Sequence, residues 1–157
     1  MSLEKVQQYF SGLGIADRII VLEQSSATVA LAAQALNTEE ARIAKTLSFM
    51  VAGSPVLIVT AGDTKIDNAK YKGKFGAKAK MLTAEELESL VGHLPGGVCP
   101  FGIKENVKVY LDESLKRFQT VFPACGSENS AIEFTIPEIE KYSNFIEWVD
   151  VSKPREC

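Results

Sequence analysis

The segment Gly92–Gly102, with the sequence GHLPGGVCPFG, gathers the residues best suited to chemistry. It holds the only histidine, His93, one of three cysteines, Cys99, and also four glycines and two prolines. This composition excludes a regular helix or a central strand, so we expect a loop. Two kinds of chemistry fit it: attack by the Cys99 thiol, or binding by backbone N–H groups around Gly96 and Gly97. An ordinary Pro/Gly-rich turn is the alternative.

Lys45 is a second candidate because of the residues around it. It lies within the apolar sequence IAKTLSFMV, residues 43–51, which we expect to form a central strand. An ammonium group there is costly unless it reaches water, an anion or a hydrogen-bond acceptor. Lys45 is therefore either a ligand-binding group or a side chain that extends along an outer strand face to solvent.

A third candidate is the polar start of GSENSAIEFT, residues 126–135. Gly126, Ser127 and Asn129 are expected to form a turn between two strands. Their hydroxyl and amide groups can hold a ligand, or they can satisfy the turn itself.

Several kinds of catalytic site are excluded by what is absent. A Ser/His/Asp triad could use only His93, and no Gly-x-Ser-x-Gly sequence accompanies it. Cys99 with His93 makes only half a zinc site, and Cys99, Cys125 and Cys157 lack the spacing of a disulfide framework or a Cys-x-x-Cys site. No phosphate-binding P-loop is present. We therefore expect no metal and no cofactor, and a site built from backbone groups and a few polar side chains.

Charge is unevenly distributed along the chain. The net charge is −3, which argues against general nucleic-acid affinity. Residues 65–80, KIDNAKYKGKFGAKAK, nevertheless carry six lysines and one acid. This segment either contacts phosphates or forms a solvated surface.

Length and hydrophobicity indicate one domain over residues 1–157. No apolar run approaches the ~20 residues of a membrane helix, and the first residues, MSLEKVQQYF, do not resemble a signal peptide. We expect a cytoplasmic protein with no membrane partner.

The elements that would position these residues alternate between helix and strand. Helices are expected near residues 2–11, 29–36, 67–71, 83–91 and after Pro137, and strands at 18–23, 41–51, 54–63, 78–82, 106–112, 120–126, 130–135 and 144–150. A hairpin of residues 41–63 is the expected centre. Many connections are too short for βαβ crossovers, so we predict an α/β fold with a strongly curved mixed β-sheet, or barrel-like core, flanked by helices.

Taken in order, several segments resemble the YbaK family, also known as the prolyl-tRNA-synthetase-associated or INS-like editing domain. The matching sequences are TVALAAQAL, RIAKTLSF, VTAGDTKID, TAEELESLVGHLPGGVCPFG and CGSENSAIEFT, which together span nearly the whole chain. The resemblance implies a barrel-like mixed sheet and hydrolysis of the ester that joins a wrong, small amino acid to tRNA. The alternative is a non-catalytic module that binds aminoacyl-tRNA or a synthetase.

The resemblance also implies roles for individual residues. The catalytic set carried over is Lys45 with the backbone of Gly96, Gly97 and Val98, in the family's Gly-x-x-x-Pro loop. The residues carried over to substrate binding are His93, Cys99, Pro100, Gly126, Ser127 and Asn129. The implied partners are the acceptor end of a mischarged tRNA and, as a further candidate, an aminoacyl-tRNA synthetase. Cys99 is a departure within the loop and leaves the preferred amino acid open.

Overall fold

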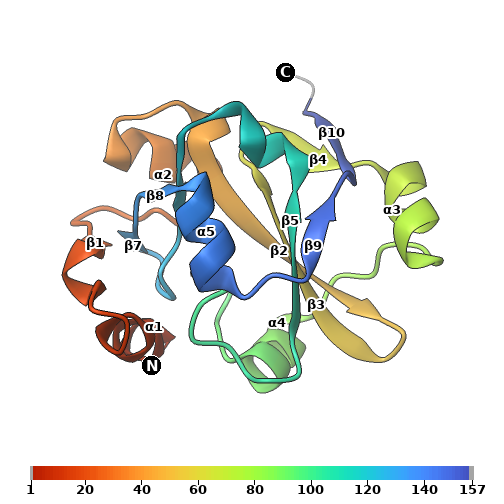
Figure 1. Ribbon diagram of the computed structural model, residues 1–157, viewed down its shortest axis with the longest axis horizontal. Coiled ribbons are helices and arrows are strands. Elements are labelled where there is room, and N and C mark those ends of the chain that lie inside the picture. The colour runs from red at the N-terminus through yellow and green to blue at the C-terminus, as the bar shows by residue number, and fades with distance from the viewer. Residues whose placement is uncertain (1, 156–157) are drawn as a thin grey trace.

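A computed structural model describes residues 2–155, so Cys157 lies outside the described residues. The main sheet has six strands, in the spatial order β8 (Phe134–Thr135), β6 (Thr120–Pro123), β2 (Ile43–Val51), β3 (Ser54–Ala61), β5 (Lys108–Asp112) and β9 (Glu147–Val149). Two small antiparallel sheets pair β1 (Ile20–Val21) with β7 (Ser130–Ala131) and β4 (Thr64–Ile66) with β10 (Ser152–Pro154). The sheet is mixed and curled, which confirms the predicted fold class (Figure 1).

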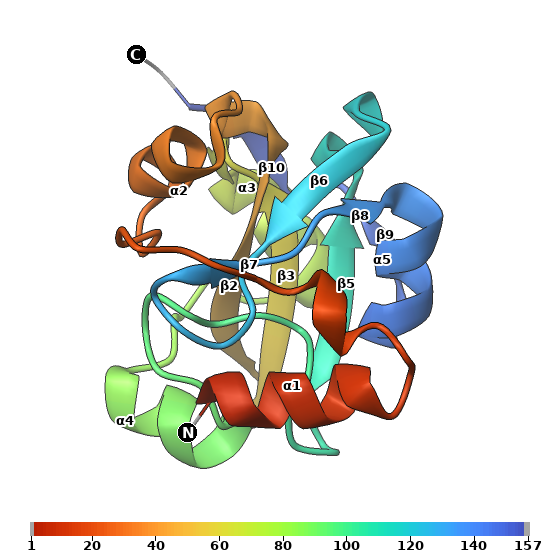
Figure 2. The same cartoon turned by 90° about the vertical axis from the view of Figure 1, so that its left-hand side faces the viewer.

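Helices surround this sheet (Figures 1 and 2). The α-helices are α1 (Ser2–Ser11), α2 (Val29–Leu36), α3 (Asn68–Phe75), α4 (Ala84–Glu86) and α5 (Ile136–Ser143). Single turns of tighter or wider helix are η1 (Ala16–Arg18), η2 (Glu40–Arg42), η3 (Leu87–Val91) and η4 (Glu113–Arg117). Within residues 2–155, none of the helices combines the length and the hydrophobicity needed to cross a bilayer.

The hairpin of β2 and β3 is the centre of the sheet, as predicted. Its eight residue pairs run from Ala44↔Ala61 to Val51↔Ser54. Ala52 and Gly53 make the two-residue turn, both with positive φ, which matches the twist of the flanking strands. The other β3 edge pairs with β5, so β3 is covered on both sides, whereas β6 reaches β2 only at Ile43 and Ala44.

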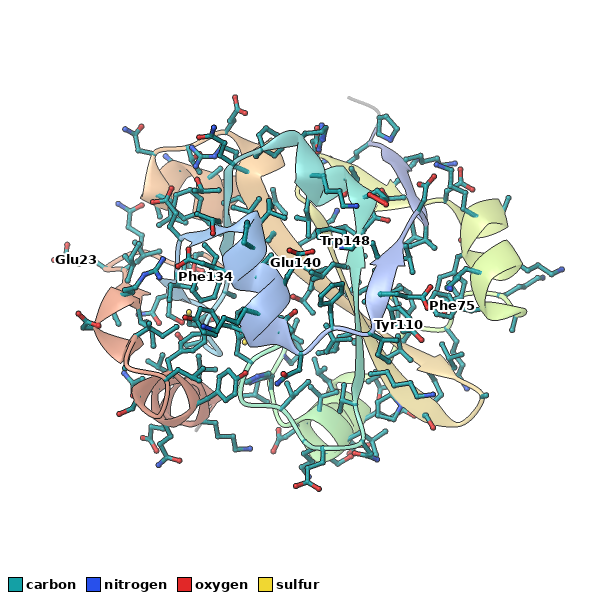
Figure 3. The ribbon with its side chains drawn as sticks, in the orientation of Figure 1. Glu23, Phe75, Tyr110, Phe134, Glu140 and Trp148 are labelled. Atoms are coloured by element: carbon teal, nitrogen blue, oxygen red, sulfur yellow. The ribbon has the colours of Figure 1, made fainter. Side chains whose placement is uncertain are left out.

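Aromatic packing fixes the Gly92–Gly102 loop to the main core. Phe101 is fully buried, and its ring centroid lies 4.9 Å from that of Phe10 in α1 and 5.6 Å from that of Phe134 in β8. A second cluster packs α3 against the sheet, with Phe75 edge-on to Tyr110 at 5.3 Å, as labelled in Figure 3. The loop is therefore held at its C-terminal end by buried rings.

Three predicted strands differ most from the expectation. The 130–135 strand is divided: β7 pairs with β1, whereas β8 pairs with β6. The division follows from burial, because the consecutive residues Ala131 and Ile132 are both buried, which one regularly alternating strand with a single buried face does not allow. The 18–23 strand is reduced to β1, and the 78–82 strand to a single bridge between Met81 and Phe49.

The helix that leads into the loop begins as predicted. Thr83 and Glu86 form a capping box at its start. The helix then widens into the π-helical turn η3 and ends at Gly92, whose φ of 101° suits a residue without a Cβ. The glycine therefore turns the chain directly into the loop.

Candidate functional site

A cavity of about 310 Å³ brings several predicted site residues together. It lies where α2, one edge of β2 and the Gly92–Gly102 loop meet, and Lys45, Gly96 and Val98 all line it. Most of its other lining side chains are small or apolar, among them Ala27, Val29, Ala32, Ile43, Phe122 and Ala131. The cavity is thus an apolar chamber with a lysine and loop backbone in its wall.

The loop and the polar turn are in direct backbone contact. A Cβ built on Gly97 would lie 2.6 Å from the carbonyl carbon of Gly126 and 2.6 Å from the nitrogen of Ser127. Gly96 has a φ of 90°, a conformation that side chains disfavour. Both glycines are therefore required by the geometry, one by close approach and one by its backbone angle.

Backbone N–H groups of the loop differ in their availability. The Gly97 N–H donates to the carbonyl of Leu94 at 3.2 Å and so closes a turn. Within residues 2–155, the N–H groups of Gly96 and Val98 have no protein acceptor. These two residues line the cavity, so their N–H groups are candidate loop donors for a ligand.

Lys45 lies at the end of the cavity nearest β4. Its side chain is half-buried, and its Nζ donates to the backbone carbonyl of Thr64. Burial lowers the pKa of Lys45, the nearby Arg155 lowers it further, and Asp63 opposes the change. Asp63 is itself held by Arg117, at 2.6 Å and 3.0 Å. The Lys45 ammonium therefore lies among charged groups and loses its proton more readily than an ordinary lysine.

His93 and Cys99 are brought together, but in the core and away from the cavity. Both side chains are fully buried. His93 Nε2 donates to the carbonyl of Phe101 at 2.8 Å, and Cys99 Sγ lies 3.5 Å from the same nitrogen. Since Nε2 carries the proton, it cannot act as a base for the thiol. Burial also raises the pKa of Cys99 to about 12, so nothing in this arrangement activates a thiolate nucleophile.

The polar turn is held by its own side chains. Ser127 Oγ donates to Asn129 Oδ1 at 3.0 Å, and Asn129 Nδ2 donates to the carbonyl of Leu22 at 3.0 Å. Gly126, Ser127 and Asn129 line a separate hollow of about 660 Å³, and Gly97 lines this hollow too, not the 310 Å³ cavity. Pro100 lines a third hollow, of about 290 Å³. These four predicted residues do not line the 310 Å³ cavity.

Other lining residues were not predicted from the sequence. The segment Ser26–Thr28, one face of α2, Thr46 and Ser130 all line the cavity. Ser26 N donates to the carbonyl of Glu128, which ties this segment to the polar turn. Thr46 could have been predicted, because it directly follows Lys45 in the sequence. The α2 face could not, because its alanines are equally typical of an ordinary hydrophobic core. Within residues 2–155, no three His, Cys, Asp or Glu side chains are grouped so as to hold a metal ion.

The lysine-rich segment is only partly free of acidic partners. Lys70 binds Asp150 at 3.0 Å, and Lys74 is paired with Glu147. Lys65 remains exposed on β4, directly opposite the exposed Lys153 of β10.

Comparison with known proteins agrees with this geometry. A family profile for the aminoacyl-tRNA editing domain matches residues 23–142. YwhH of Bacillus subtilis, an uncharacterized protein, is 51% identical over 99% of this chain and 100% of its own. EbsC of Enterococcus faecalis, named as a proposed Cys-tRNA(Pro)/Cys-tRNA(Cys) deacylase, is 30% identical over 71% of this chain and 70% of its own.

A solved structure supports the same assignment. The crystal structure of a proposed trans-editing enzyme for prolyl tRNA synthetase superposes with a TM-score of 0.86 and 27% identity, over 97% of each chain. The profile match extends from the segment before α2, through the loop and the polar turn, into α5, and so includes every element around the cavity. The chain belongs to the aminoacyl-tRNA editing domain family.

Proposed function

We propose that this protein hydrolyses the ester bond between a small amino acid and tRNA, and that the 310 Å³ cavity receives the aminoacyl group. The observation that carries the proposal is the convergence of Lys45, Gly96 and Val98 on one small, largely apolar chamber. We further propose that residues 1–157 act as one editing domain, since α1 packs into the main core and β10 pairs with β4.

The chemistry needs no protein nucleophile. An aminoacyl ester is already activated, so a water molecule can add to its carbonyl carbon and form a tetrahedral oxyanion. In this proposal the N–H groups of Gly96 and Val98 donate to that oxyanion, and one such donor is worth on the order of 3 kcal/mol. The intermediate then collapses by releasing the ribose oxygen, which takes up the proton that the attacking water gives up. The Lys45 ammonium binds the terminal nucleotide or holds the reacting group.

The remaining predicted residues are proposed to act indirectly. Cys99 and His93 fill the core beneath the loop, and Pro100 fixes its far end. Gly126, Ser127 and Asn129 hold the turn against which Gly97 rests. Together they fix the position of the loop backbone and do not contact the reacting ester.

Cavity size sets the expected preference. A volume of about 310 Å³ is at the lower limit of the ~300–1,000 Å³ typical of ligand sites. A chamber of this kind excludes large side chains by steric clash, whereas it discriminates weakly among small ones. We therefore expect alanine, serine or cysteine as the amino acid removed.

The direct test is a panel of purified tRNAs charged with alanine, serine, cysteine, leucine and phenylalanine. We expect release of free amino acid from at least one small-residue ester at ten times the spontaneous rate or more, and none above background from leucyl- and phenylalanyl-tRNA. Release from neither class, together with retained binding of tRNA or a synthetase, would instead identify a non-catalytic binding module.

The tRNA itself is proposed to contact the β4–β10 ribbon. Lys65 and Lys153 face each other there, and like charges in opposed positions destabilise an antiparallel pair unless an anion compensates them. Asp67 lies near Lys153, but its carboxylate already accepts from the N–H groups of Ala69 and Lys70. Since Lys45 binds the carbonyl of Thr64, this ribbon adjoins the cavity.

Charge reversal at Lys65→Glu with Lys153→Glu is expected to raise KM for aminoacyl-tRNA roughly tenfold and to reduce the slope of log(kcat/KM) against log[salt] by about one to two. Hydrolysis of the same amino acid from aminoacyl-adenosine should not change. The matched control is Lys108→Glu with Lys141→Glu, which changes the net charge equally on β5 and α5. Equal effects of both pairs would contradict a specific contact.

A further inference from the structure

Within residues 2–155, one stretch of β2 lacks a strand partner on the edge away from β3, beside the cavity. On the side away from β3, β6 pairs with β2 only at Ile43 and Ala44. The next bonds on that side are from Leu82 N–H to the Ser48 carbonyl at 3.2 Å and from Met50 N–H to the Lys80 carbonyl at 2.8 Å. Thr46 lies in the gap between them and lines the cavity.

The direction of the Thr46 backbone follows from the alternation of a strand. In an antiparallel pair, the N–H and C=O of one residue point to the same side, and the next residue points to the other. The backbone groups of Ser48 and Met50 form hydrogen bonds on the side away from β3. Thr46 is two residues before Ser48, so its N–H and C=O point to the same open edge. Buried backbone groups are seldom left without partners, so a ligand is expected to complete them.

We infer that this open edge at Thr46 is the binding site for the α-amino ester itself. The inference rests on the proposed deacylase function. An aminoacyl group carries an ammonium donor and a carbonyl acceptor on one α-carbon, which is the pattern of one residue in a facing strand. The ammonium donates to the Thr46 carbonyl, and the Thr46 N–H donates to the acyl oxygen. The amino acid thus forms a single-residue strand between β2 and the end of β6.

This arrangement explains two features of the site. Binding through the Thr46 backbone is independent of the side chain of the bound amino acid, so the apolar walls of the cavity must select among amino acids. The Thr46 N–H also bonds the oxygen that becomes the oxyanion, and it therefore adds a third donor to those of Gly96 and Val98.

The test compares esters that differ only in the amino group. Alanyl-tRNA is paired with propionyl-tRNA, and seryl-tRNA with 3-hydroxypropionyl-tRNA, each rate being divided by its own spontaneous hydrolysis. Loss of a hydrogen bond from a charged donor predicts that kcat/KM falls roughly tenfold to a hundredfold for both des-amino esters. Equal normalised rates would overturn the proposed binding of the α-amino group at Thr46 and leave the deacylase function intact. If no aminoacyl ester is hydrolysed, both the proposed deacylase function and the proposed binding site at Thr46 are wrong.

A protein variant tests the N–H separately. Thr46→Pro removes the Thr46 N–H, which has no strand partner within residues 2–155, together with the threonine side chain, whose own contribution Thr46→Ala measures. The preceding residue is already extended, as proline requires. The matched control is Ser48→Pro, on the same edge but outside the cavity lining. We expect Thr46→Pro to lower kcat on alanyl-tRNA at least tenfold relative to Ser48→Pro. Equal kcat values would remove the N–H from the site, and if either variant fails to fold, the ester comparison decides.

Discussion

Replacing Lys45 with alanine is expected to lower kcat/KM for the best small aminoacyl-tRNA by about 100-fold, comparable to the loss of one well-placed donor. The side chain lies in the cavity wall, and in the proposed mechanism its ammonium binds the terminal nucleotide or holds the reacting group. Among residues 2–155, the Lys45 side chain makes a hydrogen bond to the Thr64 carbonyl and no ion pair, so the substitution breaks no ion pair there. Stability should therefore change little, and single-turnover hydrolysis will measure the chemical effect.

The matched control is Lys108→Ala, since Lys108 is an exposed lysine on β5 of the same sheet. It should keep wild-type kcat/KM. Full activity of Lys45→Ala, with the thermal midpoint unchanged, would remove Lys45 from the mechanism.

The pH dependence gives the protonation state that Lys45 uses. Burial and the nearby Arg155 both lower its pKa, so the ammonium is lost at a lower pH than in an ordinary lysine. If the charged form acts, the rate divided by spontaneous hydrolysis is highest below the lowered pKa and falls as pH rises through it. Lys45→Arg keeps its charge and should move that fall to higher pH. A normalised rate that rises through the same range would assign Lys45 as a base.

The sequence was sufficient to predict the central hairpin and the loop, because each depends on local signals. Alternating and continuous apolar runs predict β2 and β3, and the glycines and prolines of residues 92–102 exclude regular structure. The capping box at Thr83 was likewise visible in the spacing of two side chains. These features are fixed by residues close together in the chain.

The cavity could not be predicted in the same way, because its shape depends on where distant strands stop pairing. β6 leaves β2 after Ala44, and no local pattern marks that point. The opposite wall comes from α2, whose small apolar residues are equally suited to a closed core. The residue types of His93 and Cys99 made both candidate site residues, but the buried Phe101 carbonyl and the surrounding core determine where they lie.

Gly97→Ala is the second substitution with a large expected effect. Its Cβ would lie 2.6 Å from two backbone atoms, of Gly126 and Ser127, and neither can move as a flexible side chain would. The polar turn is also tied to Ser26 through the Glu128 carbonyl, so it cannot retreat freely. We expect a loss of about 1–3 kcal/mol in the free energy of unfolding, measured by urea denaturation.

Activity should fall more steeply than stability. The loop must shift to relieve the contact, and a displacement of about 1 Å at a reacting group can cost about 100-fold in rate. Gly96 and Val98 flank Gly97, so their N–H groups would move away from the ester. The matched control is Gly73→Ala in α3, where an added Cβ meets nothing within 4 Å and alanine favours the helix. If Gly97→Ala matches Gly73→Ala in activity and stability, the loop and the turn are not the rigid wall on which the proposed oxyanion site depends.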